Sequence, residues 1–196
     1  MPSSWSFAAL AALLFVLPAR AQEFEEPQRA APRSKHSMYT PSSHLFSCEL
    51  PSAWQPPEDE DALGPVARLL GPDNPAGNYR TGFSVRWIEK GTPGYVEPQK
   101  AVEKMRRSDK ETGRSSGGVS VMRVGGLLGR LFEVVETRTL PLERLPARDQ
   151  ALHHYLAVIP NGENYYLVRL SSTRDVYLDF REDWFRCLRT FRPIGR

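Results

Sequence analysis

The apolar and polar positions divide the chain into three parts. Residues 7–17 form an uninterrupted apolar run that ends at Pro18. Residues 22–43 are polar, contain several prolines and show no apolar period, which is typical of a flexible linker. From His44 onward, apolar residues alternate with polar ones or recur at helical spacing. A single folded domain is therefore predicted over residues 44–196.

Alternating apolar residues predict about six β-strands in this domain. In the first strand, Phe46, Cys48 and Leu50 share one face, because successive side chains of a strand point to opposite faces. Asn161-Gly162 predicts a tight hairpin between two later strands, since both residues tolerate positive φ. The strand patterns fall at residues 45–50, 81–88, 119–124, 131–139, 153–159 and 165–170, with the short run 66–70 as a weaker candidate.

Two segments have the periodicity of amphipathic helices. In residues 98–108, Ala101, Val102 and Met105 fall on one face, and the proline at position 98 suits a first helical turn. The second segment covers about residues 174–190. Its apolar stripe consists of Tyr177, Phe180, Trp184, Cys187, Leu188 and Phe191. Hairpins with two such helices, each covering part of a sheet face, predict an α+β sandwich.

Four motifs in this order resemble the PsbP-like family, which includes the extrinsic photosystem II subunit and a nuclear Ran-binding release factor. The motifs are FSCELPSAW, FSVRWIEKGTPGYVEPQKAVEKM, VMRVGGLLGRLFEVV and YYLVRLSSTRDVYLDFREDWFRCLRTF, and they extend from Phe46 to Phe191. They are patterns of apolar residues and turns. The resemblance implies an α/β/α sandwich in which helices cover an antiparallel sheet, and a role in binding other proteins. It carries over no catalytic or binding residue.

Residues 1–21 have the features of a cleavable signal peptide. The apolar run is shorter than the roughly 20 residues that span a bilayer. Ala19 and Ala21 supply the small residues that a signal peptidase requires, so cleavage is predicted before Gln22. Residues 2–6 depart from the pattern because they contain no Lys or Arg, and a buried N-terminal helix is the alternative. We expect export to the periplasm or the cell exterior, with no transmembrane segment in the mature chain.

Cys48 and Cys187 are the only cysteines. Export would place them in an oxidising compartment, where disulfides form and persist. The strand and helix registers point both side chains into the core, so a disulfide between the first strand and the last helix is geometrically possible. The alternative is a pair of separate buried thiols that pack as small hydrophobic groups.

The net charge of +3 gives no general attraction for nucleic acid or membranes. A local basic face exists on the predicted internal helix, where Lys100, Lys104 and Arg107 recur at spacings of four and three. This face is a candidate contact for an anionic surface, such as a lipid headgroup or a cell-wall polymer. The alternative is an ordinary solvated helix face.

The motifs that suggest catalysis or metal binding lack their required context. Residues 113–117 match G-x-S-x-G, but the preceding residues are hydrophilic and do not form the apolar strand that a nucleophile elbow needs. His153 and His154 are predicted to point to opposite faces of a strand, which disfavours a shared metal. The acidic residues 56–61 lack the spacing of a calcium loop and are predicted to form a solvated loop. Residues 125–129 lack the Lys of a phosphate loop. We therefore predict no enzymatic activity, metal or cofactor.

These observations favour an exported, non-enzymatic binding or accessory protein that acts through protein–protein contacts in the cell envelope. The alternative is a small-molecule or lipid-binding module with a pocket between sheet and helix. Nucleic acid is not an expected partner. The sequence does not identify the partner, and an enzyme with clustered carboxylates or histidines remains a third hypothesis.

Overall fold

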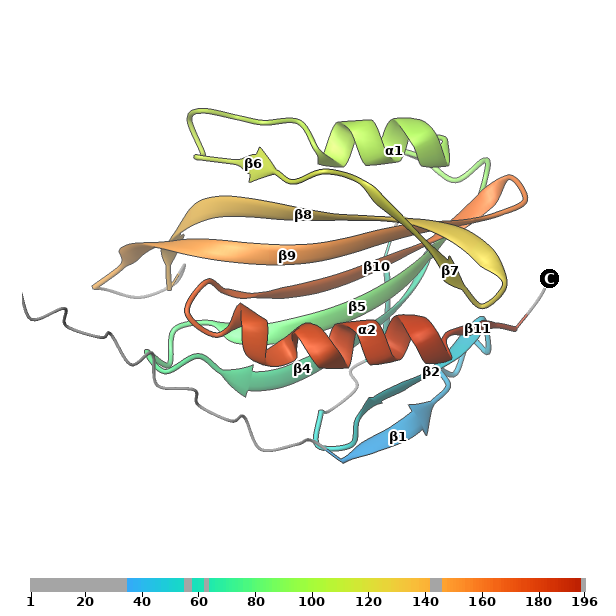
Figure 1. Ribbon diagram of the computed structural model, residues 1–196, viewed down its shortest axis with the longest axis horizontal. Helices are drawn as coiled ribbons and strands as arrows, with labels where there is room; N and C mark the ends of the chain where they lie inside the picture. The colour runs from blue at the N-terminus through green and yellow to red at the C-terminus, as the bar shows by residue number, and fades with distance from the viewer. Residues whose placement is uncertain (1–34, 55–57, 62–63, 142–145, 195–196) are drawn as a thin grey trace, which may run out of the picture. The chain divides into compact units, whose positions relative to one another are not determined.

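The computed structural model describes residues 35–54, 58–61, 64–141 and 146–194 (Figure 1). The predicted signal peptide and the first part of the predicted linker lie outside these residues. No helix in the described part of the chain is long and apolar enough to cross a membrane.

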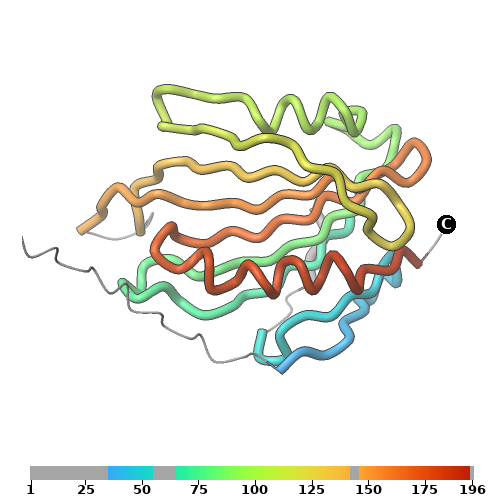
Figure 2. The backbone as a smooth tube through the Cα atoms, in the orientation of Figure 1, coloured from blue at the N-terminus to red at the C-terminus, as the bar shows by residue number. Residues whose placement is uncertain are grey.

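The domain is built on a main sheet of eight strands in which all neighbours are antiparallel. Its order is β3-β4-β5-β10-β9-β8-β6, and β7 also pairs with β8. The strands are β3 (Glu58–Asp61), β4 (Gly64–Asp73), β5 (Arg80–Ile88), β6 (Ser115–Ser116), β7 (Ser120–Val124), β8 (Leu127–Leu140), β9 (Arg148–Asn161) and β10 (Asn164–Thr173). The long strands run side by side in Figure 2.

A second, three-stranded sheet has the order β1-β2-β11, with β1 (His36–Tyr39), β2 (Phe46–Pro51) and β11 (Arg192–Pro193). The helices are α1 (Pro98–Met105), the 3₁₀ helix η1 (Tyr177–Phe180) and α2 (Arg181–Thr190). Two short helices with a mostly antiparallel sheet make an α+β fold, as predicted. The predicted terminal helix is divided in two, since residues 177–180 form a tighter 3₁₀ turn that keeps a similar apolar spacing.

The predicted count of about six strands was too low. Glu58–Asp61, expected as an acidic loop, pairs with β4 as a strand. Its side chains are all acidic, so it has none of the apolar alternation by which strands were recognised. β6 and β11 have two residues each, which is too short to show a period.

Alternate residues along the same strands belong to two different hydrophobic clusters. Tyr155, Ala157 and Ile159 of β9 pack in the cluster that contains β2 and α2 residues, whereas Leu156 and Val158 pack in the cluster that contains α1 residues. Because alternate side chains of a strand point to opposite faces, α1 and α2 contact opposite faces of the main sheet.

The folded domain begins earlier than the predicted boundary at His44. His36–Tyr39, expected within the flexible linker, forms β1 and pairs in antiparallel register with β2. His36 Nε2 also lies 2.7 Å from Oδ1 of the buried Asp183 in α2. Burial raises the pKa of Asp183, and the contact with His36 offsets part of that rise. The polar composition of β1 concealed this strand, because its partners lie far away in the sequence.

A chain shortened to begin at His44 is expected to be less stable than one beginning at Lys35 by about 1–3 kcal/mol, because Asp183 stays buried without its partner. Urea unfolding of both chains measures this difference. The variant His36→Ala in the longer chain removes the contact with Asp183 while retaining the β1–β2 pairing. Equal unfolding midpoints for all three proteins would show that β1 contributes nothing to stability.

Candidate functional site

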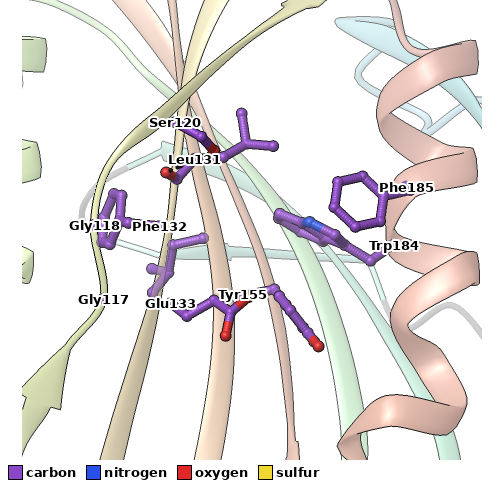
Figure 3. Close-up of a pocket in the computed structure, with 10 residues that line it drawn as sticks. Gly117, Gly118, Ser120, Leu131, Phe132, Glu133, Tyr155, Trp184 and Phe185 are labelled. Atoms are coloured by element: carbon purple, nitrogen blue, oxygen red, sulfur yellow. Dashed lines mark hydrogen bonds between the residues drawn. The ribbon is translucent and has the colours of Figure 1, made fainter.

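A pocket of about 300 Å³ lies between α2 and the face of the main sheet that α2 contacts (Figure 3). Four parts of the chain line it: the neighbouring strands β8 and β9, the segment that joins β6 to β7, the start of β7, and the first half of α2. The lining residues are Gly117, Gly118, Ser120, Leu131, Phe132, Glu133, Tyr155, Leu156, Trp184 and Phe185.

Strand register places the sheet residues of the pocket together. Glu133 of β8 is paired with Tyr155 of β9, so their side chains emerge next to each other on one face. Ser120 of β7 is paired with Leu131 of β8 in the same way. The pocket wall thus spans three adjacent strands, and its composition depends on the register of each pair.

Aromatic side chains form the side of the pocket nearest to α2. Trp184 is almost fully buried and lies 5.8 Å from the ring of Phe83 and 6.0 Å from the ring of Tyr155, measured between centroids. Phe185 is partly buried, and the guanidinium of Arg181 lies 5.7 Å from the centre of its ring. Because Trp184 is held by the core on one side, this wall is rigid and apolar.

The carboxylate of Glu133 forms the polar end of the pocket, and His153 contacts it from beside the pocket. His153 Nε2 donates a hydrogen bond to Glu133 Oε2 at 3.0 Å, and the His153 ring stacks on Tyr177 of η1 at 3.8 Å. Burial lowers the pKa of His153, and Glu133 offsets only part of this effect, so the imidazole is neutral at pH 7. Burial, with the neighbouring Glu133 carboxylate, raises the pKa of Tyr155 to about 12, so the phenol keeps its proton.

Two glycines leave one rim of the pocket open. A Cβ atom on Gly117 would meet only Glu133, at 4.0 Å, which is ordinary van der Waals contact. A Cβ atom on Gly118 would have nothing within 4 Å. The absence of side chains at these positions keeps the space above Glu133 accessible.

This arrangement is suited to binding an apolar or aromatic group and has no assembled nucleophile. The hydroxyl of Ser120 donates to the backbone oxygen of Leu131 at 3.4 Å, whereas His153 is bonded to Glu133. In the residues that the structure describes, no three His, Cys, Asp or Glu side chains gather to hold a metal ion. Ser115 of the G-x-S-x-G match lies in the edge strand β6, which is not the apolar strand-to-helix turn of a hydrolase.

The two cysteines singled out in the sequence lie outside the pocket. Cys48 and Cys187 are fully buried neighbours in the core and are free thiols in this structure. Burial, together with the Cys48 thiol beside it, raises the pKa of Cys187 well above its usual range. The inward direction predicted for both side chains is therefore correct, and their bridging stays a prediction.

The basic face on the internal helix also stays a prediction. Lys100, Lys104 and Arg107 are all exposed, and Arg107 lies just beyond the end of α1. Lys100 Nζ is 3.1 Å from a carboxylate oxygen of Glu97 at the surface. These residues belong to the element that covers the other face of the sheet, so they have no part in the pocket.

No motif in the sequence pointed directly to the pocket. Trp184 was recognised only as part of an apolar stripe, and the pairing of His153 with Glu133 depends on the β8–β9 register. The only local signal was the pair of glycines at 117 and 118, whose lack of side chains is compatible with an open rim. The opposite directions predicted for His153 and His154 are confirmed, because they contact different groups on the two faces.

Comparison with known proteins gives matches among solved structures alone. No protein family matches the chain, and no curated protein does. The chain resembles solved PsbP-like structures. Cyanobacterial PsbP (CyanoP) from Synechocystis sp. PCC 6803 matches with a TM-score of 0.48 and 9% identity, over 84% of this chain and 95% of that protein.

Two further solved structures show a similar degree of likeness. The Ran-binding protein Mog1p of Saccharomyces cerevisiae has a TM-score of 0.49 and 8% identity, over 83% of this chain and 97% of its own. Protein PA94 from Pseudomonas aeruginosa, a protein of unknown function, has a TM-score of 0.48 and 14% identity, over 80% of this chain and 96% of its own. All three TM-scores lie below 0.5, so the likeness carries no inference about function.

Proposed function

We propose that this chain is a non-enzymatic binding protein that holds an extended apolar segment of a partner protein along β7, with one side chain of that segment in the pocket. The observation that carries the proposal is an open aromatic pocket next to an edge strand of the main sheet. The α1 and α2 contacts on opposite faces support the α/β/α arrangement that the family resemblance implies.

The edge strand supplies the backbone groups for this interaction. Within the described residues, β7 pairs with β8 alone. A strand at a sheet edge presents unpaired N–H and C=O groups to which another extended segment can add. Val119 and Val121 are 39% and 66% exposed at this edge, so it also offers apolar surface. An added segment would contact both backbone and side chains here.

The pocket supplies the specificity. Ser120 of β7 lines the pocket, so a segment that lies beside β7 passes the open rim at Gly117 and Gly118. Alternate side chains of an extended segment point to the same face, and one of them would contact Trp184 and Phe185. Large apolar side chains that fill such pockets contribute most of the binding energy of many interfaces.

Residues 1–21 support export, and export would place the partner in the cell envelope or outside the cell. Mass spectrometry of the protein from the exported fraction tests this part separately. A mature N-terminus at Gln22 is the expected result, and an intact N-terminus would contradict it.

The second candidate function is binding of a small amphipathic molecule or lipid. The polar groups of Glu133 and Tyr155 support it, because a few polar groups in an apolar pocket orient small ligands. The volume of about 300 Å³ is at the lower limit of such pockets, which favours a single side chain or ring.

Binding of extended apolar peptides is expected to depend both on the open rim of the pocket at Gly117 and on the edge strand β7. A displayed library of random heptapeptides is panned against the chain, and the affinity of the best binder is measured by calorimetry. Gly117→Leu fills the mouth of the pocket and Val121→Lys puts a charge on the edge, so each should weaken binding about tenfold or more. Leu178→Lys is the control, since Leu178 is 60% exposed on η1, away from the edge.

Two results would contradict this function. One is a library that yields no peptide with alternating apolar residues, and the other is a peptide that binds all three variants as tightly as the parent chain. Native mass spectrometry of the purified protein distinguishes the second candidate, because a retained small molecule that Gly117→Leu displaces supports it.

A further inference from the structure

A cluster of charged residues lies on the face of the main sheet opposite to the pocket. On three adjacent strands the residues that pack in the cluster with α1 are apolar. On each of these strands, the residue two positions away on the same face is ionisable. Val134 is followed by Glu136 in β8, Leu156 is preceded by His154 in β9, and Leu167 is followed by Arg169 in β10. Because Arg169 pairs with Leu156 and His154 pairs with Val134, the boundary between the apolar and the polar residues runs diagonally across the three strands.

Glu136 is the carboxylate of this cluster and is almost fully buried. It accepts hydrogen bonds from Arg114 and, at 2.7 Å, from Nε of Arg138. Burial works against ionisation of this carboxyl, but His154, Arg138 and Arg114 more than offset it, and the pKa of Glu136 is lowered. The negative charge of Glu136 is thus already compensated by the two arginines that are hydrogen-bonded to it.

Arg169 is the guanidinium whose hydrogen-bond partners are neutral. Its Nε donates to Ser171 Oγ at 2.8 Å, and one terminal nitrogen donates to His154 Nδ1 at 3.1 Å. Since His154 Nδ1 accepts this bond, the imidazole is neutral and its Nε2 carries the proton toward Glu136, 3.4 Å away. No carboxylate among the described residues is hydrogen-bonded to Arg169.

The cluster therefore has an excess of positive charge. Arg114, Arg138 and Arg169 contribute three guanidinium groups, and Glu136 is the one carboxylate in the described part of the chain that interacts with all three. Arg138 is 53% exposed, so water solvates part of its charge. Arg169 is partly buried and interacts with Glu136 only at longer range, because no carboxylate among the described residues forms a direct ion pair with it, which is unfavourable for a charge removed from water. A bound anion would remove this imbalance.

Unused hydrogen-bond donors accompany the excess charge. In the described residues Arg138 donates through Nε alone, which leaves its two terminal nitrogens for another acceptor. The Thr173 hydroxyl is buried without a hydrogen-bond partner, and it lies on the same face of β10 as Arg169 and Ser171. Buried hydroxyls usually have a partner, so this one indicates an acceptor that the described residues do not supply.

We propose that Arg169 and Arg138 bind a small oxyanion of the phosphate class at this face. Guanidinium groups present paired N–H donors that match the oxygens of phosphate, and they are the preferred residues for such anions in partly buried sites. The anion lies across β8 and β10, over the neutral His154. The site is independent of the peptide-binding function, because it uses the opposite face of the sheet.

Calorimetric titration with inorganic phosphate at constant ionic strength tests the proposal. The full chain is expected to bind phosphate saturably, and Arg169→Gln should weaken binding by about tenfold or more, because it removes a charge-assisted hydrogen bond. Arg138→Gln should weaken it as well, and this exposed position allows the test if Arg169→Gln does not fold. Arg189→Gln is the control, since it removes the same charge from the exposed surface of α2.

Vesicles distinguish the possible sources of the phosphate group. Binding to phosphatidylglycerol vesicles and not to phosphatidylcholine vesicles, lost in Arg169→Gln and kept in Arg189→Gln, assigns the site to a lipid headgroup. Binding of free phosphate without vesicle binding assigns it to a soluble phosphate compound. Absence of both, or equal losses in Arg169→Gln and Arg189→Gln, would overturn the proposal.

Discussion

A disulfide between Cys48 and Cys187 is expected to raise the free energy of unfolding by about 4–5 kcal/mol in the chain-entropy model. The effect is large because the bridge would close a loop that covers nearly the whole folded domain and would restrict the unfolded chain accordingly. Both thiols are fully buried neighbours, one in β2 and one in α2, so neither element has to move far to form the bond.

We expect the two thiols to be oxidised to a disulfide during folding. In the folded protein the same reaction is expected to be slow. The thiolate is the reactive form, and burial raises the pKa of Cys187, which keeps that thiol protonated. The chain is therefore refolded with a glutathione redox buffer or with a reductant, and urea unfolding compares the two products. Mass spectrometry without reduction first establishes the bridge, and Cys48→Ala/Cys187→Ala shows the stability of a chain that cannot form it.

The disulfide proposal has a clear negative result. If the chain refolded under oxidising conditions still contains two free thiols, the cysteines are packed as small apolar side chains and nothing more. If the bridge forms without a rise in stability, strain in the folded state cancels the entropic effect.

Acidification is expected to destabilise the domain through His154. Burial, with Arg169 beside it, lowers the pKa of His154 from 6.5 to about 3. The unfolded chain therefore binds a proton between these pH values that the folded chain does not bind, and stability falls as the pH falls through this range. For this one group the limiting slope is about 1.4 kcal/mol per pH unit.

Urea unfolding between pH 7 and pH 4 measures this slope. His154→Gln cannot take up the proton and should show a clearly weaker pH dependence, even if the variant is less stable at pH 7. His44→Asn is the matched control, because His44 is exposed and its positive φ suits asparagine. Equal slopes for His154→Gln and the parent chain would show that another group controls acid stability.

Local patterns in the sequence were sufficient for the α+β class and for the direction of many core side chains. Phe46, Cys48 and Leu50 point into one cluster, as their alternation predicts. The Asn161-Gly162 hairpin joins β9 and β10, and Gly162 adopts the expected positive φ. These predictions are correct because alternation, helical period and turn geometry each depend on a few neighbouring residues.

The polar edge strands show where such patterns fail. β1 and β3 have no apolar alternation, and they become strands because a neighbouring strand offers backbone hydrogen bonds. Their pairing depends on segments that lie elsewhere in the sequence. The early start of the domain at β1 follows from this, as does the underestimated number of strands.

The sequence by itself determined which side chains face inward along the strands and helices that have an apolar period, because that depends on local backbone geometry. The tertiary structure alone decided which of them meet: His153 with Glu133 beside the pocket, and Arg169 with His154 on the opposite face. Strand register and helix docking bring these residues together, and both are set by the free energy of packing distant segments against one another.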